Sequence, residues 1–89
     1  MLLKINKLLL QSSGTDLTPA VQEMYINTDM IQTIRAYPKV KEYLRSHGDF
    51  ATNEYSLIEY GNQEKEEIIV QGTPEEILTK RVTAKVLYG

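Results

Sequence analysis

One stretch of the chain, Glu66–Leu78, places a strand, a tight turn and a helix start within thirteen consecutive residues. Its apolar run Ile68–Val70 is typical of a strand that is buried on both faces. After the turn, Thr73 offers a hydroxyl at the helix N-cap and Pro74 takes the first helical position. Glu76 adds the carboxylate of a capping box, in which two side chains satisfy each other's backbone N–H groups. We therefore predict a short helix, capped by Thr73 and Glu76, directly after a buried strand.

Alternating apolar and polar residues predict further strands. Together with the strand just described, the predicted set is Leu2–Leu10, Glu23–Asn27, Met30–Tyr37, Tyr55–Tyr60 and Glu66–Gln71. For the first segment an amphipathic helix is the alternative, because Leu2, Ile5 and Leu9 also fit helical spacing. In Met30–Tyr37 apolar residues occur on both parities, so the pattern does not decide which side chains point inward.

The connections carry turn chemistry. Gln11–Ala20 contains two serines, a glycine, an aspartate and a proline, which predicts a flexible loop. Asn27–Asp29 offers side-chain oxygens that stabilise a tight turn, and Gly61–Gln63 is the expected turn of a hairpin. Asp49–Asn53 is predicted to be a second loop.

Pro38 has no amide hydrogen to donate, so it should end strand pairing and start a short helix over Lys39–His47. Gly48 is placed as the left-handed stop of that helix. The side chains predicted to share its buried stripe are Val40, Tyr43 and Leu44.

The last part of the chain is predicted to hold the capped helix from Pro74 to about Lys80, with Ile77 and Leu78 packing inward. Val82–Tyr88 alternates again, as a final strand or an extended arm. The fold class is α+β and mainly β: a small antiparallel sheet or barrel-like module with one or two short helices. Residues 1–89 form one small domain, with an arm at Val82–Gly89.

Composition narrows the class of protein. The 89 residues include no cysteine, which excludes disulfides and most structural zinc sites. A domain of this size buries only roughly 60 to 65% of its unfolded surface, so an efficient core or a partner must stabilise it. The net charge of −2 lacks the basic excess of non-specific nucleic-acid binding, and no apolar run is long enough to span a bilayer. A soluble protein without membrane or nucleic-acid partners is expected.

Few residues suggest a catalytic or ligand-binding site. His47 is the only histidine, and without partners it is best explained as a solvated residue at a helix end. The acidic residues of the second half are Glu64, Glu66, Glu67, Glu75 and Glu76, which cap a helix or flank a hairpin and could form an acidic contact patch. Lys39, Lys41 and Arg45 form a small basic patch, most simply a solvated helix face. We therefore expect no enzymatic activity, no catalytic or metal site and no cofactor.

Tyrosine is the most suggestive component of the composition. The chain has six tyrosines, and this side chain combines a large apolar body with a polar tip that suits protein interfaces. About half of them are expected in the core. The residues predicted to make protein contacts are Tyr43, Arg45, Leu87 and Tyr88.

Two segments, 23–38 and 55–82, together resemble the small FlbD-like proteins of flagellar operons. The residues that carry the resemblance are Tyr25, Ile26, Asn27, Asp29, Ile31, Ile34, Pro38, Leu57, Gly61, Ile69, Val70, Glu75, Glu76 and Ile77. The chain departs from the family pattern at Gln11–Ala20, at the apparent insertion Lys39–Asn53 and at the extension Val82–Gly89. The sequence also resembles small accessory proteins of crAss-like phages that infect gut Bacteroidetes.

These resemblances imply a compact β-rich module that makes protein contacts, and they bring no catalytic residues. The expected function is a non-enzymatic structural or interaction module that docks on a larger assembly, as an auxiliary capsid protein of a phage virion. Capsid subunits and further copies of the chain are the expected partners. The alternative is a cytoplasmic FlbD-like regulatory protein that acts on a protein or nucleic-acid partner.

Overall fold

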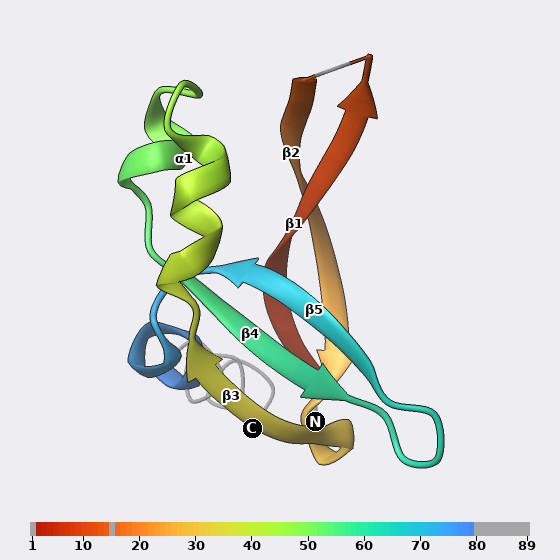
Figure 1. The fold of residues 1–89 in the computed structure, drawn as a ribbon. Helices are drawn as coiled ribbons and strands as arrows, with labels where there is room; N and C mark the ends of the chain where they lie inside the picture. Colours follow the sequence, from red (N-terminus) through yellow and green to blue (C-terminus); the bar gives the residue numbers. More distant parts are fainter. Residues whose placement is uncertain (1, 15, 80–89) are drawn as a thin grey trace.

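A computed structural model describes residues 2–14 and 16–79. Its strands are β1 (Leu2–Ser13), β2 (Asp16–Asn27), β3 (Ile31–Ala36), β4 (Tyr55–Tyr60) and β5 (Glu66–Gln71). Its short helices are η1 (Thr28–Met30), η2 (Pro38–Leu44) and α1 (Asp49–Thr52), and residues 74–79 are also helical. The five strands form one open antiparallel sheet in the order β2-β1-β5-β4-β3, which confirms the predicted mainly β fold (Figure 1).

The sheet consists of two parts that cross at a large angle. β3, β4 and β5 pair over most of their length, and β1 and β2 form a long hairpin. The parts meet where β1 runs across β5, with Lys7 and Val70 as the registered pair (Figure 1). The long hairpin therefore extends past the three-stranded part of the sheet.

The predicted loop at Gln11–Ala20 is wrong. Both strands of the hairpin run through this segment, and Ser13 pairs with Asp16, so most of it is strand. Gly14 lies in the turn between the strands with φ at 66°, a conformation that favours glycine. Ser12, Thr18 and Pro19 are strand residues near the exposed end of the hairpin, where solvent can satisfy polar groups.

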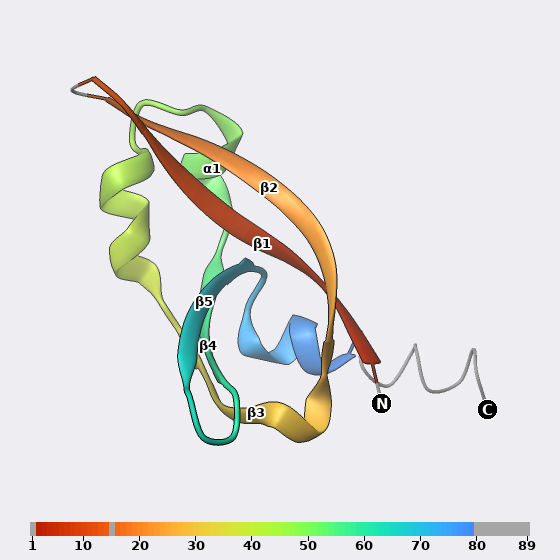
Figure 2. The same ribbon diagram turned by 90° about the vertical axis from the view of Figure 1, so that its right-hand side faces the viewer.

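The inner core fills the concave side of the sheet. Its buried residues are Leu3, Ile5, Ile26, Ile58, Ile68, Val70 and Ile77. The register explains this set, since Ile5 lies opposite the half-buried Met24, and Ile58 pairs with both Ile34 and Ile68. Figure 2 shows the helix at residues 74–79 inside the curve of the sheet, where it brings Ile77 to this core.

A shift in strand register decides which side chains of β3 point inward, which the alternation of apolar residues did not. Ile31 pairs with Tyr60 and Thr33 pairs with Glu59, so the β3 register shifts between these residues. Because of this irregularity Ile31 and Ile34, which have opposite parity, both pack against the inner core.

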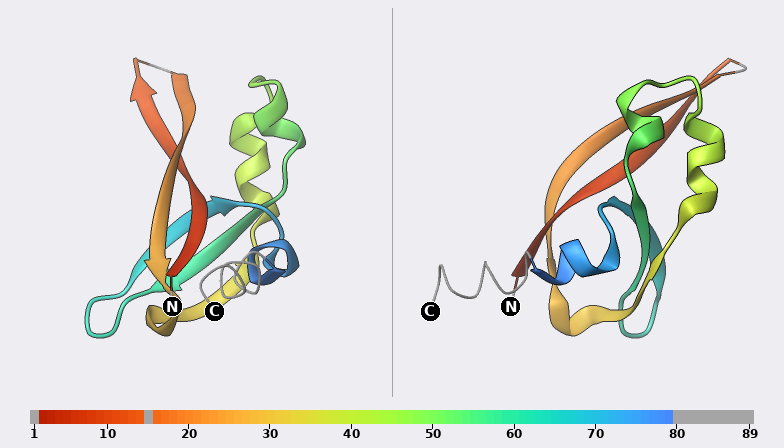
Figure 3. Two further views of the ribbon diagram at one scale, coloured as in Figure 1. Left: turned by 180° about the vertical axis from the view of Figure 1, so that it is seen from behind. Right: turned by 90° about the vertical axis from the view of Figure 1, so that its left-hand side faces the viewer.

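The outer core lies on the other face of the sheet and consists of Leu8, Val40, Leu44 and Tyr55. Its strand residues have the opposite parity to those of the inner core. η2 and the half-buried Phe50 of α1 cover it (Figure 3). The segment that looked inserted, residues 39–53, is therefore the cover of a second core.

Two details of this cover correct the sequence prediction. The single helix predicted over Lys39–His47 is a 3-10 helix that ends at Leu44, and part of the predicted second loop is the short helix α1. Gly48, with φ at 54°, is the N-cap of α1, where it lies between the two helices. Tyr43 is 53% exposed, so it does not share the buried stripe of Val40 and Leu44.

The predicted helix cap is confirmed. The Thr73 N–H donates to Glu76 Oε1 at 3.3 Å, and the Glu76 N–H donates to Thr73 Oγ1 at 3.1 Å. Both bonds are those of a capping box. Ile77 is buried as predicted, but Leu78 is 44% exposed and does not pack inward.

Gly61 shows why the turn after β4 needs glycine. Its φ is 120°, and a Cβ at this position would run into the backbone carbonyl of Glu64. Its N–H donates to the Met30 carbonyl at 2.8 Å, and its own carbonyl accepts from Gln32 Nε2 at 3.1 Å. The turn is thereby tied to η1 and the start of β3.

Candidate interaction surface

Among the strands that the structure describes, none lies beside the outer side of β2. β2 lies at the end of the sheet order and pairs with β1 alone among residues 2–14 and 16–79. Its register against β1 runs through twelve consecutive pairs with no shift. The result is a regular strand edge whose outward backbone groups are free to pair with another strand.

Pro19 identifies the residues that point to this edge. It lacks an N–H and pairs with Leu10, so the pair must be of the type that makes no hydrogen bonds across the hairpin. Pair types alternate along an antiparallel ladder. Val21, Glu23 and Tyr25 therefore also direct their backbone N–H and C=O groups away from β1.

Exposed apolar side chains lie along this edge. We call Leu2, Lys4, Val21, Glu23 and Tyr25 the hairpin face, because the register places them on one face of the hairpin. Leu2 is 55% exposed, Val21 39% and Tyr25 58%. Lys4 Nζ lies 3.4 Å from Glu23 Oε2, so the two charges of the face pair with each other. Apolar area beside an open strand edge is what a protein partner can use.

The contact residues predicted from the sequence lie elsewhere. Tyr43 and Arg45 are exposed at the end of η2 and just after it. Within the described part of the chain neither side chain makes a hydrogen bond or ion pair. Leu87 and Tyr88 lie outside the described residues, as does the predicted arm at Val82–Gly89. The structure thus adds the hairpin face, which sequence reasoning did not identify.

Exposed ion pairs engage one member of each predicted charge cluster. Lys41 of the basic patch lies 3.2 Å from Glu54. Glu67 lies 3.8 Å from Arg35, across the sheet on β3. Exposed pairs of this kind contribute about 0 to 1 kcal/mol each, and they leave less uncompensated charge for a partner.

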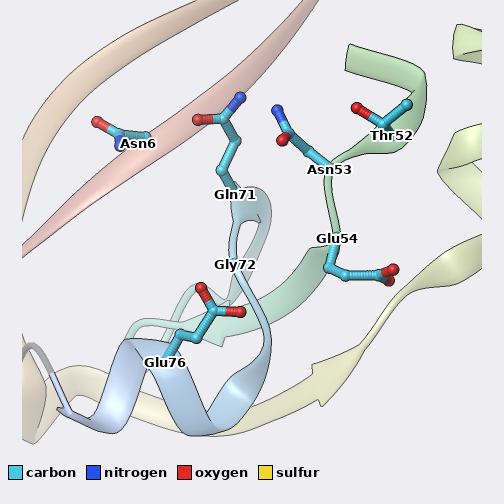
Figure 4. Close-up of a pocket in the computed structure, with 7 residues that line it drawn as sticks. All are labelled: Asn6, Thr52, Asn53, Glu54, Gln71, Gly72 and Glu76. Atoms are coloured by element: carbon cyan, nitrogen blue, oxygen red, sulfur yellow. The ribbon is translucent and has the colours of Figure 1, made fainter. Parts of the chain in front are cut away.

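A polar pocket of about 320 Å³ opens where β1, β5 and α1 approach each other. It is lined by Asn6, Thr52, Asn53, Glu54, Gln71, Gly72 and Glu76, and Figure 4 shows amide side chains from three segments around it. Glu76 already accepts the capping bond and Glu54 already pairs with Lys41. The amides could hydrogen-bond a small polar molecule, but the two carboxylates are engaged in the fold.

Near this pocket, the hydroxyl of Tyr55 has a shifted pKa. Burial raises the pKa of its hydroxyl, and hydrogen bonding by Gln71 and Asn53 acts in the opposite direction with smaller effect. The hydroxyl also donates to the Phe50 carbonyl at 2.8 Å, which fixes α1 to β4. The shift follows from a structural role and does not indicate a catalytic acid.

Residues 2–14 and 16–79 contain no group of three or more His, Asp or Glu side chains that could hold a metal ion. Across the same ranges, every buried side-chain nitrogen or oxygen has a hydrogen-bond partner. None of the described helices is long and apolar enough to cross a membrane.

No protein-family model, curated protein or solved structure matches this chain. The resemblances to FlbD-like proteins and to phage accessory proteins therefore stay predictions from the sequence, and the function must be argued from the surface itself.

Proposed function

We propose that this protein is a non-enzymatic interaction module that docks on a larger assembly through its β1–β2 hairpin. The observation that carries the proposal is the unpaired edge of β2 with Val21 and Tyr25 exposed beside it. An added strand gains affinity from backbone hydrogen bonds and specificity from side chains on alternate positions. Tyrosine is also enriched at protein interfaces.

The shape of the hairpin supports this role. Its far end extends beyond the three-stranded part of the sheet, while its near end contributes Leu3 and Ile5 to the inner core (Figure 1). Val21 and Tyr25 lie on the anchored part of the hairpin, so the core holds the proposed docking positions in place while their side chains are exposed to a partner.

The larger assembly that we propose is a phage virion, with this protein as an auxiliary capsid protein. That part of the proposal rests on the sequence resemblance to phage accessory proteins. Capsid subunits are then the partners to look for, and the protein should co-fractionate with intact particles.

Affinity capture from the native source tests the proposal. Wild-type protein should recover a small set of assembly components, identified by mass spectrometry, in constant ratio to the bait. The double variant Val21→Lys/Tyr25→Glu should lower this recovery about tenfold, the effect of losing some 1.4 kcal/mol of binding. Asn62→Lys is the control, since it introduces a charge at an exposed position in the turn between β4 and β5, away from the hairpin. Equal recovery by the double variant, or capture of no assembly component by wild type, would contradict the proposal.

A further inference from the structure

The edge of β2 is longer and more regular than strand edges usually are, although it carries one proline, Pro19. Natural edges are short, bulged, or carry lysine or proline. β3, the other edge, has six residues and a register shift. β2 has twelve residues and no shift against β1, and after Pro19 it contains neither lysine nor proline. The part of the edge after Pro19 can therefore accept a partner strand.

The side chains along this edge are arranged symmetrically about Val21. Leu17 lies four residues before Val21 and Tyr25 lies four residues after it, and all three share the parity of Pro19. In an antiparallel pair centred on Val21, Leu17 of each copy faces Tyr25 of the other. The edge is therefore complementary to itself.

Charge favours the same register. With Val21 at the centre, Glu23 faces Pro19 of the other copy and meets no like charge. A register centred on Glu23 would place two carboxylates directly opposite each other, which is destabilising. Pro19 costs each copy one backbone donor, so each Pro19–Glu23 pair makes one hydrogen bond, whereas the Val21 pair and the Leu17–Tyr25 pairs make two each.

We propose that two copies of this chain pair through the free edges of β2, antiparallel, about a two-fold axis at Val21. The inference rests on the proposed function as an interaction module: it assigns the backbone edge of β2 to a second copy, and the assembly then docks on the hairpin faces that the joined sheet presents. The two sheets then become one continuous sheet with an isologous interface.

The absence of cysteine makes a direct test available. Val21→Cys places one thiol in each copy at the axis. Directly opposed residues of a hydrogen-bonded antiparallel pair have Cα atoms about 5.5 Å apart, within the span of a disulfide. Mild oxidation should therefore convert Val21→Cys to a covalent dimer at least about tenfold faster than a matched control.

Tyr25→Cys is that control. In the proposed dimer the two cysteines at position 25 are eight residues apart along the strands, about 27 Å at 3.4 Å per residue, so this variant alone should not cross-link readily. Mixing Leu17→Cys with Tyr25→Cys should give a mixed disulfide dimer, because the register makes these positions neighbours. Circular dichroism of each variant checks that the fold is intact.

Sedimentation equilibrium of the wild-type protein provides a second measurement that needs no substitution. It should show a monomer–dimer equilibrium that Val21→Lys shifts to monomer. A wild-type monomer at all concentrations, or cross-linking of Tyr25→Cys as fast as Val21→Cys, would overturn the inference. If capture of assembly components is nevertheless lost in the hairpin double variant, the proposed function stands without the dimer. A dimer that captures no assembly component would instead contradict the proposed function alone.

Discussion

The two faces of the sheet are covered by different helices and have different cores. The inner core is entirely aliphatic, and its helical cover follows β5 after a turn at Gly72 and Thr73. The outer core is smaller, includes Tyr55, and is covered by η2 and α1, which lie between β3 and β4 in the chain. Polar bonds serve both covers: the capping box lies within the inner helix, whereas the bonds of Tyr55 and Lys41 tie the outer cover to the sheet.

Two polar interactions attach the outer cover, and they make it more sensitive to solution conditions than the inner core. The hydrogen bond from Tyr55 to the Phe50 carbonyl and the ion pair of Lys41 with Glu54 fix the outer cover to β4 and the residue before it. The Tyr55 bond responds to alkaline pH and the ion pair to ionic strength, whereas the buried residues of the inner core carry no ionisable group. The outer face should therefore be the first to loosen.

The largest expected effect comes from truncating each core in turn. Ile58 and Leu44 are both fully buried, one in each core. Replacing a buried Leu or Ile by alanine costs about 2 to 5 kcal/mol of unfolding free energy. We expect Ile58→Ala near the upper end and Leu44→Ala near the lower end, measured by urea unfolding. Equal losses would contradict the ranking of the two cores.

Loss of the capping box should have a smaller effect, on the inner face alone. Thr73→Ala removes the acceptor of the Glu76 N–H bond and should cost about 1 kcal/mol. Thr73→Ser keeps the hydroxyl and serves as the control. A loss of exchange protection at the amide of Ile77, with none at Leu44, would localise the change to the inner cover.

Alkaline pH should weaken the outer face selectively. Because burial raises the pKa of Tyr55, the folded state favours its protonated form. The stability that this provides is fully present below the ordinary tyrosine pKa of about 10 and is lost as pH rises above it. Unfolding measured from pH 8 upward should show this loss in wild type.

The matched controls are Tyr55→Phe, which should lack this component of the pH dependence, and Tyr25→Phe, which should keep it. An unchanged pH profile in Tyr55→Phe would show that other groups cause the loss.

The smallest effect is expected at the hairpin face. Val21→Thr keeps a β-branched side chain at a partly exposed position, so unfolding of the isolated monomer should change by no more than about 0.5 kcal/mol. Dilute protein must be used, because association stabilises the folded state by mass action. A large loss in dilute solution would mean that Val21 serves the fold and not an interface.

The sequence predicted the elements that local patterns determine. The β4–β5 hairpin, the bend at Asn27 and the capping box of Thr73 all follow from neighbouring residues, and the structure contains each of them. In the bend, the Asp29 N–H donates to Asn27 Oδ1 at 3.0 Å. Such features need no knowledge of the distant chain.

Features set by distant contacts were missed. The polar residues of Gln11–Ala20 suit a loop as well as an exposed hairpin end, and only pairing with the rest of β1 and β2 decides between them. Tyr43 and Leu78 fit a buried stripe by spacing, but the cores are filled by their neighbours Leu44 and Ile77. The open edge of β2 could not be predicted, because a strand lacks a neighbour only in the context of the whole sheet. Pro19 was the one sequence signal for this edge, because a proline within a strand favours an edge position.

The unequal edges also limit how far an assembly could grow. Each copy has one regular edge, at β2, and one short edge with a register shift, at β3. Pairing through β2 uses up the regular edges of both copies and leaves only the two β3 strands at the ends of the joined sheet. Such a sheet closes at two copies, so the same open strand that recruits a partner would not propagate into a fibre.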